Sequence, residues 1–288
     1  MSDGVALDGV ADFEPHRGFL AGLAYRMLGS FAEAEDVVQD AFLRWREVDR
    51  GAIAEPRAYL SRVVSRLCLD RMKSASHRRE QYVGMWLPEP VVAQPAQSLA
   101  DDLSVALLLA LERLSPLERA AFLLHDVFDM DYPDVAATLE SSEAACRQLA
   151  ARARDHVRQD RPRYAANDAA ARKLADAFVT AAATGDVGGL ARLLADDAVF
   201  YADGGGKRRA ALNPIVGKDR IVRFYEGLRA KDSGAFTAYR ADPATLNGMP
   251  GFVFHTAEGT ETLAFDIANG QVVAIYGVRN PDKLRHFS

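Results

Sequence analysis

Cysteine and histidine are scarce in this sequence. The 288 residues include two cysteines, Cys68 and Cys146, which fall in helical patterns without a cysteine or histidine partner nearby. We therefore expect reduced thiols rather than a disulfide or a zinc site. The six histidines are scattered and show no ligand spacing. The sequence thus predicts no metal site, and nothing in it calls for a cofactor.

Long apolar runs and a general excess of positive charge are also absent. The longest apolar run, residues 103–111, is shorter than the roughly 20 residues that cross a bilayer. The N-terminal segment is acidic and lacks a signal-peptide core, so we expect a cytoplasmic protein with no membrane partner. The 35 Lys and Arg against 40 Asp and Glu give a net charge of −5, which excludes a uniformly basic nucleic-acid-binding protein.

Positive charge nevertheless gathers in two stretches of this acidic chain. Residues 56–79 hold seven basic side chains and one acid, and residues 147–163 hold six arginines and two acids. Such local concentration favours contact with a polyanion at two places. Each stretch taken alone has a plainer interpretation as a solvated helix face.

The periodicity of the chain changes near residue 165. Before it, apolar residues recur at helical spacing except in the proline-containing stretch 84–97, which is a predicted linker. After it, Asn269-Gly270 predicts a hairpin turn. The helices predicted there are 168–184, 186–195 and 218–230, and the strands are 199–203, 236–240, 251–256, 260–267 and 271–278. The expected fold class is multidomain: all-α domains followed by an α+β domain with helices on one face of a curved sheet.

A helix–turn–helix is predicted over residues 131–161, from a short helix, a break at 140–142 and a longer helix. Its second helix would enter a major groove with Glu143, Arg147 and Gln148 near base edges. Arg147 suits a guanine and Gln148 an adenine, while Arg152 and Arg154 suit phosphate. A plain helical hairpin with a solvated basic face is the alternative. The residues expected to face the core are Ala144, Ala145, Leu149 and Ala153.

Two earlier helices carry charged faces. In residues 33–47, Glu33, Asp36 and Asp40 lie opposite an apolar stripe, where they either complement the helix dipole or dock a basic protein partner. A basic helix follows and strengthens the case for two-part DNA contact. Its candidate DNA-binding residues are Arg62, Arg66, Arg71, Lys73, Arg78 and Arg79.

These segments resemble group IV (extracytoplasmic-function, ECF) sigma factors of RNA polymerase. Residues 34–45 (AEDVVQDAFLRW) are similar to the polymerase-binding helix of that family, and residues 59–71 to the helix that reads the −10 promoter element. The domain that reads the −35 element is similar to residues 114–119, 132–136 and 142–149. This resemblance adds Ser142 to the DNA-binding candidates. The resemblance implies core RNA polymerase (beta and beta-prime subunits) and promoter DNA as partners. The implied polymerase contacts are Glu35, Asp36, Gln39, Asp40, Phe42 and Trp45.

The remainder resembles the ECF41-type subgroup, whose C-terminal extension is similar to the SnoaL-like branch of the NTF2-like fold. The resemblance implies sigma region 2 at 10–83, a linker at 84–100, sigma region 4 at 101–163 and a regulatory domain at 168–288. That domain would take the place of a separate anti-sigma protein, with the linker and the extension contacting the first sigma domain. Three motifs carry the resemblance: Trp86-Leu87-Pro88-Glu89-Pro90, Asp203-Gly204-Gly205-Gly206-Lys207 and Asn280-Pro281-Asp282-Lys283-Leu284.

The C-terminal domain leaves other functions open. Asp203, His255 and Asp266 are polar groups that strand alternation could turn inward, where a carboxylate and an imidazole could perform acid–base chemistry. A small ligand could bind there instead. Docking within the chain ranks ahead of both, so we expect no enzyme. The rival functions are a one-component regulator that binds DNA without polymerase and a SnoaL-type enzyme for which residues 1–162 are dispensable.

Overall fold

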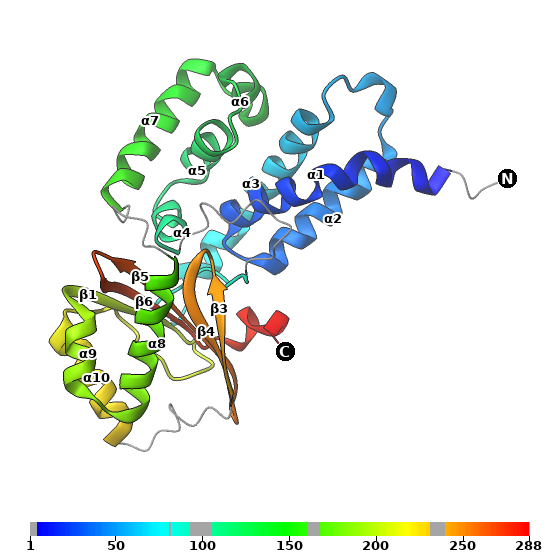
Figure 1. The fold of residues 1–288 in the computed structure, drawn as a ribbon. Helices are drawn as coiled ribbons and strands as arrows, with labels where there is room; N and C mark the ends of the chain where they lie inside the picture. Colours follow the sequence, from blue (N-terminus) through cyan, green and yellow to red (C-terminus); the bar gives the residue numbers. More distant parts are fainter. Residues whose placement is uncertain (1–4, 81, 93–104, 161–167, 231–239, 288) are drawn as a thin grey trace. The chain divides into compact units, whose positions relative to one another are not determined.

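The computed structural model of the chain describes residues 5–80, 82–92, 105–160, 168–230 and 240–287 (Figure 1). The chain divides into two compact units. The helical unit comprises residues 1–80 and 96–161, and the sheet unit comprises residues 81–95 and 162–288. The segment 81–95 therefore belongs to the sheet unit, although in sequence it lies between two parts of the helical unit.

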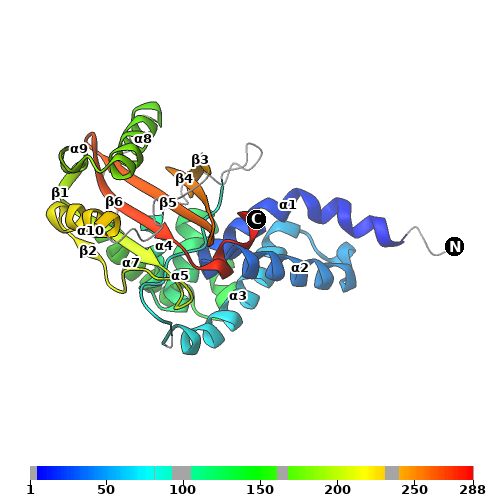
Figure 2. The ribbon, with the colours of Figure 1, turned by 90° about the horizontal axis from the view of Figure 1, so that it is seen from below.

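The helical unit begins with three long helices, α1 (Val5–Leu28), α2 (Phe31–Glu47) and α3 (Pro56–Glu80) (Figure 2). Gly29 turns the chain between α1 and α2 with a φ of 69°, and Ser30 caps α2 by accepting a hydrogen bond from the Glu33 N–H. The apolar stripes predicted from the sequence form the core between these helices. Its fully buried side chains include Leu20, Leu23, Met27, Val37, Val38, Trp45, Leu60 and Val64.

A second group of helices follows in the same unit: α4 (Val105–Glu112), α5 (Pro116–Phe122), α6 (Tyr132–Leu139) and α7 (Glu143–Asp160). A π-helical turn, Leu123–Val127, extends α5. Helix α6 ends at Glu140 in the left-handed conformation (φ 51°), and Ser142 begins α7 by accepting a hydrogen bond from the Ala145 N–H. The predicted helix–turn–helix is therefore present at α6 and α7.

The buried face of α7 differs from the predicted one. Ala153 is buried as expected, but Ala144 is exposed, and Ala145 and Leu149 are only partly buried. The buried residues of α7 are spaced three or four residues apart, as a helix of 3.6 residues per turn requires, but the series begins at Cys146 and not at Ala144 or Ala145. Its fully buried members are Cys146, Ala150, Ala153 and Val157.

The two groups of helices pack against each other within the helical unit. Arg119 in α5 is only 1% exposed and donates a hydrogen bond from Nη1 to the backbone oxygen of Met27 in α1, at 2.6 Å. The same nitrogen pairs with Glu112 Oε1 at 2.6 Å. The rings of Phe19 and Phe128 meet edge to face 4.8 Å apart nearby. A buried guanidinium needs such partners, because an unpaired buried charge costs several kcal/mol.

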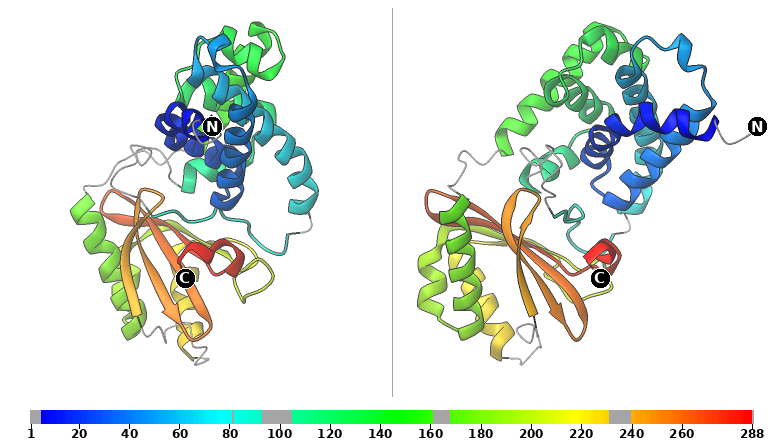
Figure 3. Two further views of the ribbon diagram at one scale, coloured as in Figure 1. Left: turned by 90° about the vertical axis from the view of Figure 1, so that its right-hand side faces the viewer. Right: turned by 45° about the vertical axis from the view of Figure 1, so that its right-hand side comes forward.

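The described residues of the sheet unit form six strands in the order β2-β1-β6-β5-β4-β3, with one parallel pair, β1 and β6, and antiparallel pairs otherwise. Helices α8, α9 and α10 cover one face of the curved sheet (Figure 3). An aromatic core that includes Phe178, Phe200, Phe252 and Phe265 lies between the two layers. The bounds are α8 (Asp168–Thr184), α9 (Val187–Leu193), β1 (Leu194–Asp203), β2 (Ile215–Val216), α10 (Lys218–Ala230), β3 (Arg240–Leu246), β4 (Met249–Thr256), β5 (Gly259–Ala268) and β6 (Gln271–Val278).

The predicted helices and most predicted strands of this unit are confirmed, and β3 was not predicted beyond its first residue. Of the predicted strand 236–240, all but Arg240 lies outside the described residues, and the observed strand is β3. Pro243 is tolerated in it because β3 is the edge strand, where a missing N–H breaks no ladder on the open side. The hairpin at Asn269-Gly270 is confirmed, with φ values of 52° and 74°. In the described part of the chain, no helix is long and apolar enough to cross a membrane.

Candidate functional site

The side chain of Asp203, at the end of β1, is fully buried and accepts four hydrogen bonds. Oδ1 accepts from the Tyr82 hydroxyl (2.5 Å) and the Gly205 N–H (3.0 Å). Oδ2 accepts from the Leu87 N–H (2.9 Å) and from Lys283 Nζ (2.7 Å). A buried carboxylate is costly unless it is paired and hydrogen-bonded, and this one has both kinds of partner. Three separate segments of the chain are thereby joined at a single carboxylate.

The glycines after Asp203 allow this close approach. The φ of Gly205 is +59°, and a Cβ atom built on it would lie 2.2 Å from Asn280 Nδ2. A Cβ on Gly204 would lie 2.1 Å from the backbone oxygen of Arg208. Larger residues at these two positions would therefore clash with the C-terminal segment or with the loop itself. The Gly-Gly-Gly sequence, which could have been a flexible turn, is an ordered loop.

The C-terminal motif closes over this loop. The backbone N–H of Asn280 donates to the Asp203 carbonyl (3.1 Å), and its Nδ2 donates to the Tyr82 hydroxyl (2.9 Å). Asn280 also caps the 3₁₀ turn Pro281–Lys283 by accepting from the Asp282 N–H (3.1 Å). Lys207 pairs with Asp282, and hydrogen bonds from Lys207 and Arg285 hold the pKa of Asp282 below its usual range. Leu284 is buried.

The linker motif supplies the third part of the site. The Leu87 side chain is fully buried, and Pro88, Glu89 and Pro90 are buried as well. Lys283 Nζ lies 4.2 Å from the centre of the Trp86 ring, a cation–π contact, and it also hydrogen-bonds the Leu87 carbonyl. All three predicted motifs therefore meet at Asp203.

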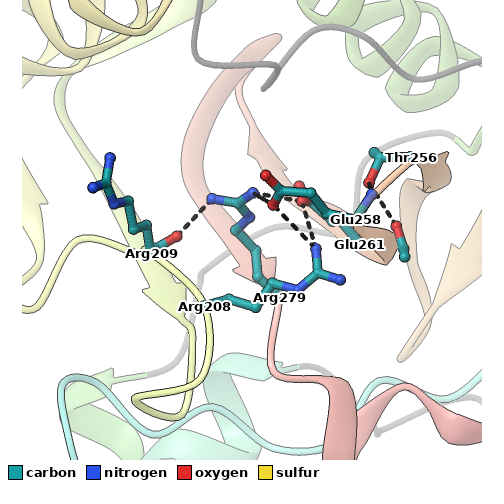
Figure 4. A network of polar contacts seen from close by, with 7 residues as sticks. Arg208, Arg209, Thr256, Glu258, Glu261 and Arg279 are labelled. Carbon is teal, nitrogen blue, oxygen red and sulfur yellow. Dashed lines mark hydrogen bonds and ion pairs between the residues drawn. The ribbon is translucent and has the colours of Figure 1, made fainter.

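A network of ion pairs and hydrogen bonds holds the residues that follow the glycine loop (Figure 4). Arg279 donates from Nη2 to Glu261 (2.6 Å) and from Nη1 to the Arg209 carbonyl (2.6 Å). Arg208 pairs with Glu258 (3.5 Å) and with Glu261 (3.6 Å). These contacts join the segment after β1, the end of β6 and the β4–β5 hairpin, so the carboxylate of Asp203 is held in a fixed frame.

Several residues of the site were not predicted from the sequence. Tyr82 precedes the linker motif, and burial together with its hydrogen bond to Asp203 raises the pKa of its phenol, so it stays a neutral donor. Asn247 and His286 bind the linker further along: the Asn247 N–H donates to the Val91 carbonyl (2.8 Å), and His286 Nε2 lies 2.8 Å from the Pro90 carbonyl. The dipeptide Asn247-Gly248 is typical of hairpin turns, so the sequence alone could have located Asn247 at a turn.

The proposed acid–base residues of the C-terminal domain do not converge. Asp203 is occupied by the four donors described above, and His255 lies 3.2 Å from Asp242 on the paired strands β3 and β4. Asp266 lies in β5, where burial raises the pKa of its carboxyl. None of the three belongs to the aromatic core between sheet and helices. The geometry gives the catalytic alternative no support.

The basic helix α3 contacts other parts of the helical unit. Arg66 pairs with Glu140 at the turn of the helix–turn–helix, at 2.9 Å. Arg71 reaches α2, where it bonds the Asp40 carboxylate (2.8 Å) and the Glu33 carbonyl (3.0 Å). Among the other candidates, Lys73 pairs with Asp70 (3.2 Å), Arg62 is half-buried, and the side chains of Arg78 and Arg79 lie outside the described residues.

The second helix of the helix–turn–helix presents its expected residues at the surface. Arg147 and Gln148 are both exposed, and Arg147 pairs with Glu143 one turn earlier (2.7 Å). Arg154 is held by Asp126 (2.6 Å) and by the Tyr132 hydroxyl (2.9 Å), so it fixes α7 onto the rest of its domain. Arg152 is exposed and pairs with Glu118 (3.0 Å).

The acidic face of α2 is also accessible. Glu35, Asp36 and Gln39 are exposed, and Asp40 is partly exposed. The two aromatic candidates lie differently: Phe42 packs against Phe13 with ring centres 5.1 Å apart, and Trp45 is only 1% exposed. Trp45 therefore supports α2 from inside the core. Leu43, which was not among the candidates, is 46% exposed beside the acidic residues.

Comparison with known proteins identifies three domains in the chain. Residues 13–78 match sigma-70 region 2, residues 104–157 match sigma-70 region 4, and residues 175–282 match the SnoaL-like domain. The ECF RNA polymerase sigma factor SigJ of Mycobacterium tuberculosis (strain ATCC 25618 / H37Rv) is 40% identical over 291 residues, which cover 95% of this chain and 92% of SigJ. A probable ECF RNA polymerase sigma factor of the same strain, SigI, is 38% identical over 73% of each chain.

A solved structure extends the likeness to the whole fold. The crystal structure of M. tuberculosis SigJ matches with a TM-score of 0.78 and 36% identity, covering 96% of this chain and 98% of that one. The fold is thus that of a sigma factor with two helical sigma domains and a SnoaL-like domain. The chain belongs to the ECF RNA polymerase sigma factors.

Replacing Asp203 tests whether its carboxylate holds the three motifs together. Asp203→Ala would leave Lys283 and three neutral donors without their acceptor, a loss of about 3–5 kcal/mol when one partner of a buried pair is removed. We expect the amides of the linker motif to exchange with deuterium about a hundredfold faster or more. Lys207→Ala, which removes an exposed ion pair, is the matched control and should change exchange little. Unchanged protection at Leu87 in Asp203→Ala would contradict the assignment.

Proposed function

We propose that this sigma factor binds core RNA polymerase in the cytoplasm and directs it to promoters with −10 and −35 elements. Its SnoaL-like domain has no catalytic task and regulates initiation through the linker between the two sigma domains. The observation that carries the regulatory part is the capture of the linker motif by the buried carboxylate of Asp203. While this motif is bound, the linker cannot extend freely between the two sigma domains.

The exposed residues of the helical unit support the two contact surfaces. Arg147 and Gln148 stand at the start of α7, where a recognition helix places its base-reading side chains. Glu35, Asp36 and Gln39 form an accessible acidic face on α2, which suits a basic surface of polymerase. The resemblance to the sigma family assigns the same tasks to these positions.

The packing of the helical unit supports conformational control. The −10 and −35 elements are centred about 25 base pairs apart, or about 85 Å at 3.4 Å per base pair. In the structure Arg66, a candidate −10 contact, is 2.9 Å from Glu140 in the turn of the −35-reading domain. The two domains must therefore separate before both elements are read together. The described structure corresponds to a closed form of the sigma factor.

The length of the linker fits this requirement. Helix α3 ends at Glu80 and helix α4 begins at Val105, so 24 residues join them. A fully extended chain of that length spans about 80 Å. Residues 82–92 of that stretch are bound to the sheet unit. Release of this segment would let the whole linker align with the promoter. Such control requires that the contacts between the linker and the sheet unit are more favourable in one form of the sigma factor, closed or polymerase-bound, than in the other.

Run-off transcription with purified core polymerase tests the proposed function. The full chain and the fragment 1–163 are compared on the same set of promoter fragments. We expect specific transcripts from at least one of the two forms, and a changed yield without a changed set of promoters when the SnoaL-like domain is removed. Failure of both forms to start RNA at any defined site would contradict the sigma assignment, and a switched promoter set would contradict the regulatory assignment.

Single substitutions in α7 distinguish base reading from phosphate binding. Arg147→Ala should lose about 1–3 kcal/mol of discrimination at one position of the −35 element, because a bidentate guanine contact carries that much. Arg152→Ala should instead weaken binding uniformly across sequences. It should also reduce the slope of log affinity against log salt concentration by about one. Promoter affinities of the two holoenzymes, measured over a panel of −35 variants, separate these effects. A uniform loss in Arg147→Ala would rule out direct readout.

Charge reversal on α2 tests the polymerase-binding face. Glu35→Lys places a positive charge on the exposed acidic face, so we expect the affinity for core polymerase to fall about tenfold, or about 1.4 kcal/mol. Glu47→Lys changes the charge by the same amount at the exposed C-terminal end of the same helix and serves as the control. Equal affinities of the two variants would mean that the acids of the first turns serve the helix dipole instead.

A further inference from the structure

The sheet unit holds residues 82–92 in the way that peptide-binding domains hold an extended ligand. We call the surface that does so the linker groove and define it by Asp203, Asn247, Lys283 and His286. We propose that the linker groove is a peptide-recognition site that also accepts this segment in trans, its ligand class being an extended peptide of the type aromatic-Leu-Pro-acidic-Pro. The proposal concerns the sheet unit alone and does not depend on the role assigned at promoters.

The groove recognises the main chain of the segment at five points. Asp203 accepts from the Leu87 N–H (2.9 Å), and Lys283 donates to the Leu87 carbonyl. Asn247 makes a two-point contact with Val91: its Oδ1 accepts from the Val91 N–H (3.1 Å) and its N–H donates to the Val91 carbonyl (2.8 Å). The fifth contact joins His286 and the Pro90 carbonyl. Main-chain hydrogen bonds of this kind supply affinity for any peptide that can adopt the extended form.

The bound sequence is prepared for that form by its two prolines. Proline fixes its own φ, and it restricts the residue before it to extended conformations. Leu87 and Glu89 both precede prolines, so the segment loses little conformational freedom when it binds. Neither Pro88 nor Pro90 has an N–H that would need an acceptor inside the groove.

Side-chain contacts then set the specificity. Leu87 is fully buried and is the apolar anchor. Glu89 is 4% exposed and lies 3.3 Å from His286 Nδ1, so the groove favours an acidic residue between the prolines. Trp86 stacks under the Lys283 ammonium at 4.2 Å. An anchor, an ion pair and a cation–π contact at adjacent positions distinguish this ligand from an arbitrary extended chain.

The linker groove is already occupied by the segment of the same chain, so a peptide from another molecule must compete with that segment. A tethered segment competes at an effective concentration of order millimolar, so a free peptide binds well only when the segment in the same chain has lost its anchor. A second copy of this chain carries the same segment and would displace the linker by the same contacts. The groove would then link the presence of that peptide to release of the linker.

A fluorescence anisotropy titration tests the proposal with a labelled peptide of residues 82–92 (YVGMWLPEPVV). The receptor is the full chain carrying Leu87→Asp, whose own segment lacks its anchor. We expect saturable binding to this variant, and binding about tenfold weaker or more to the wild-type chain, where the groove is occupied in cis. A peptide carrying the same Leu87→Asp change is the matched ligand control and should not bind.

A second receptor variant shows whether binding occurs in the linker groove. Asn247→Gly, added to Leu87→Asp, keeps a residue suited to the positive φ of 50° at this position but removes the side-chain acceptor for Val91. It should weaken peptide binding about tenfold. If Leu87→Asp alters the circular dichroism spectrum of the chain, Leu87→Ala takes its place. No saturable binding by a folded variant, or binding that Asn247→Gly leaves unchanged, would overturn the proposal.

Discussion

The carboxylate of Asp203 is the point on which the sheet unit and the linker both depend. In water a carboxylate is satisfied by solvent, but this one is fully buried and relies on the Tyr82 hydroxyl, two backbone N–H groups and the Lys283 ammonium. These donors come from three segments that lie apart in the sequence or loop back on it. The energetic need to satisfy one buried charge thus brings together the linker, the glycine loop and the C-terminal turn.

In the proposed function, this dependence connects the SnoaL-like domain to promoter recognition. The linker that joins the two sigma domains is also the ligand of the domain that follows them. Within the helical unit, Arg66 pairs with Glu140 and Arg119 is buried against α1, so the sigma domains also hold each other. The proposed control is therefore a competition between these intramolecular contacts and the contacts offered by polymerase and DNA.

Local features of this structure could be read from the sequence, whereas the long-range contacts could not. Apolar stripes predicted the helices, and Asn269-Gly270 predicted a hairpin, because both signals act over a few residues. The contacts of Asn247 and His286 with the linker join residues 156 and 196 positions apart, and no periodicity reports such pairs. Family resemblance singled out the three motifs, but it did not say that their meeting point is a buried carboxylate.

Two predictions from the sequence differ from the structure for simple physical reasons. In α7, Ala145 and Leu149 were predicted to be buried, one residue before the buried Cys146 and Ala150, because alanine-rich helices offer several apolar stripes and only packing selects among them. The strand predicted before β4 ended at residue 240, so the prediction missed residues 241–246 of β3, which include Pro243. An edge strand tolerates that proline, and the overlooked Asn247-Gly248 turn would have shown where the hairpin lies.

Capture of the linker by Asp203 is proposed to keep the sigma domains together. It is tested most directly by electron–electron double resonance between spin labels at Arg44→Cys in α2 and Ala151→Cys in α7, two exposed positions in a chain whose native cysteines are buried. The account predicts one short, narrow distance distribution in the otherwise unchanged protein and a shift to longer, broader distances when Asp203→Ala is added. Superimposable distributions in the two proteins would contradict it.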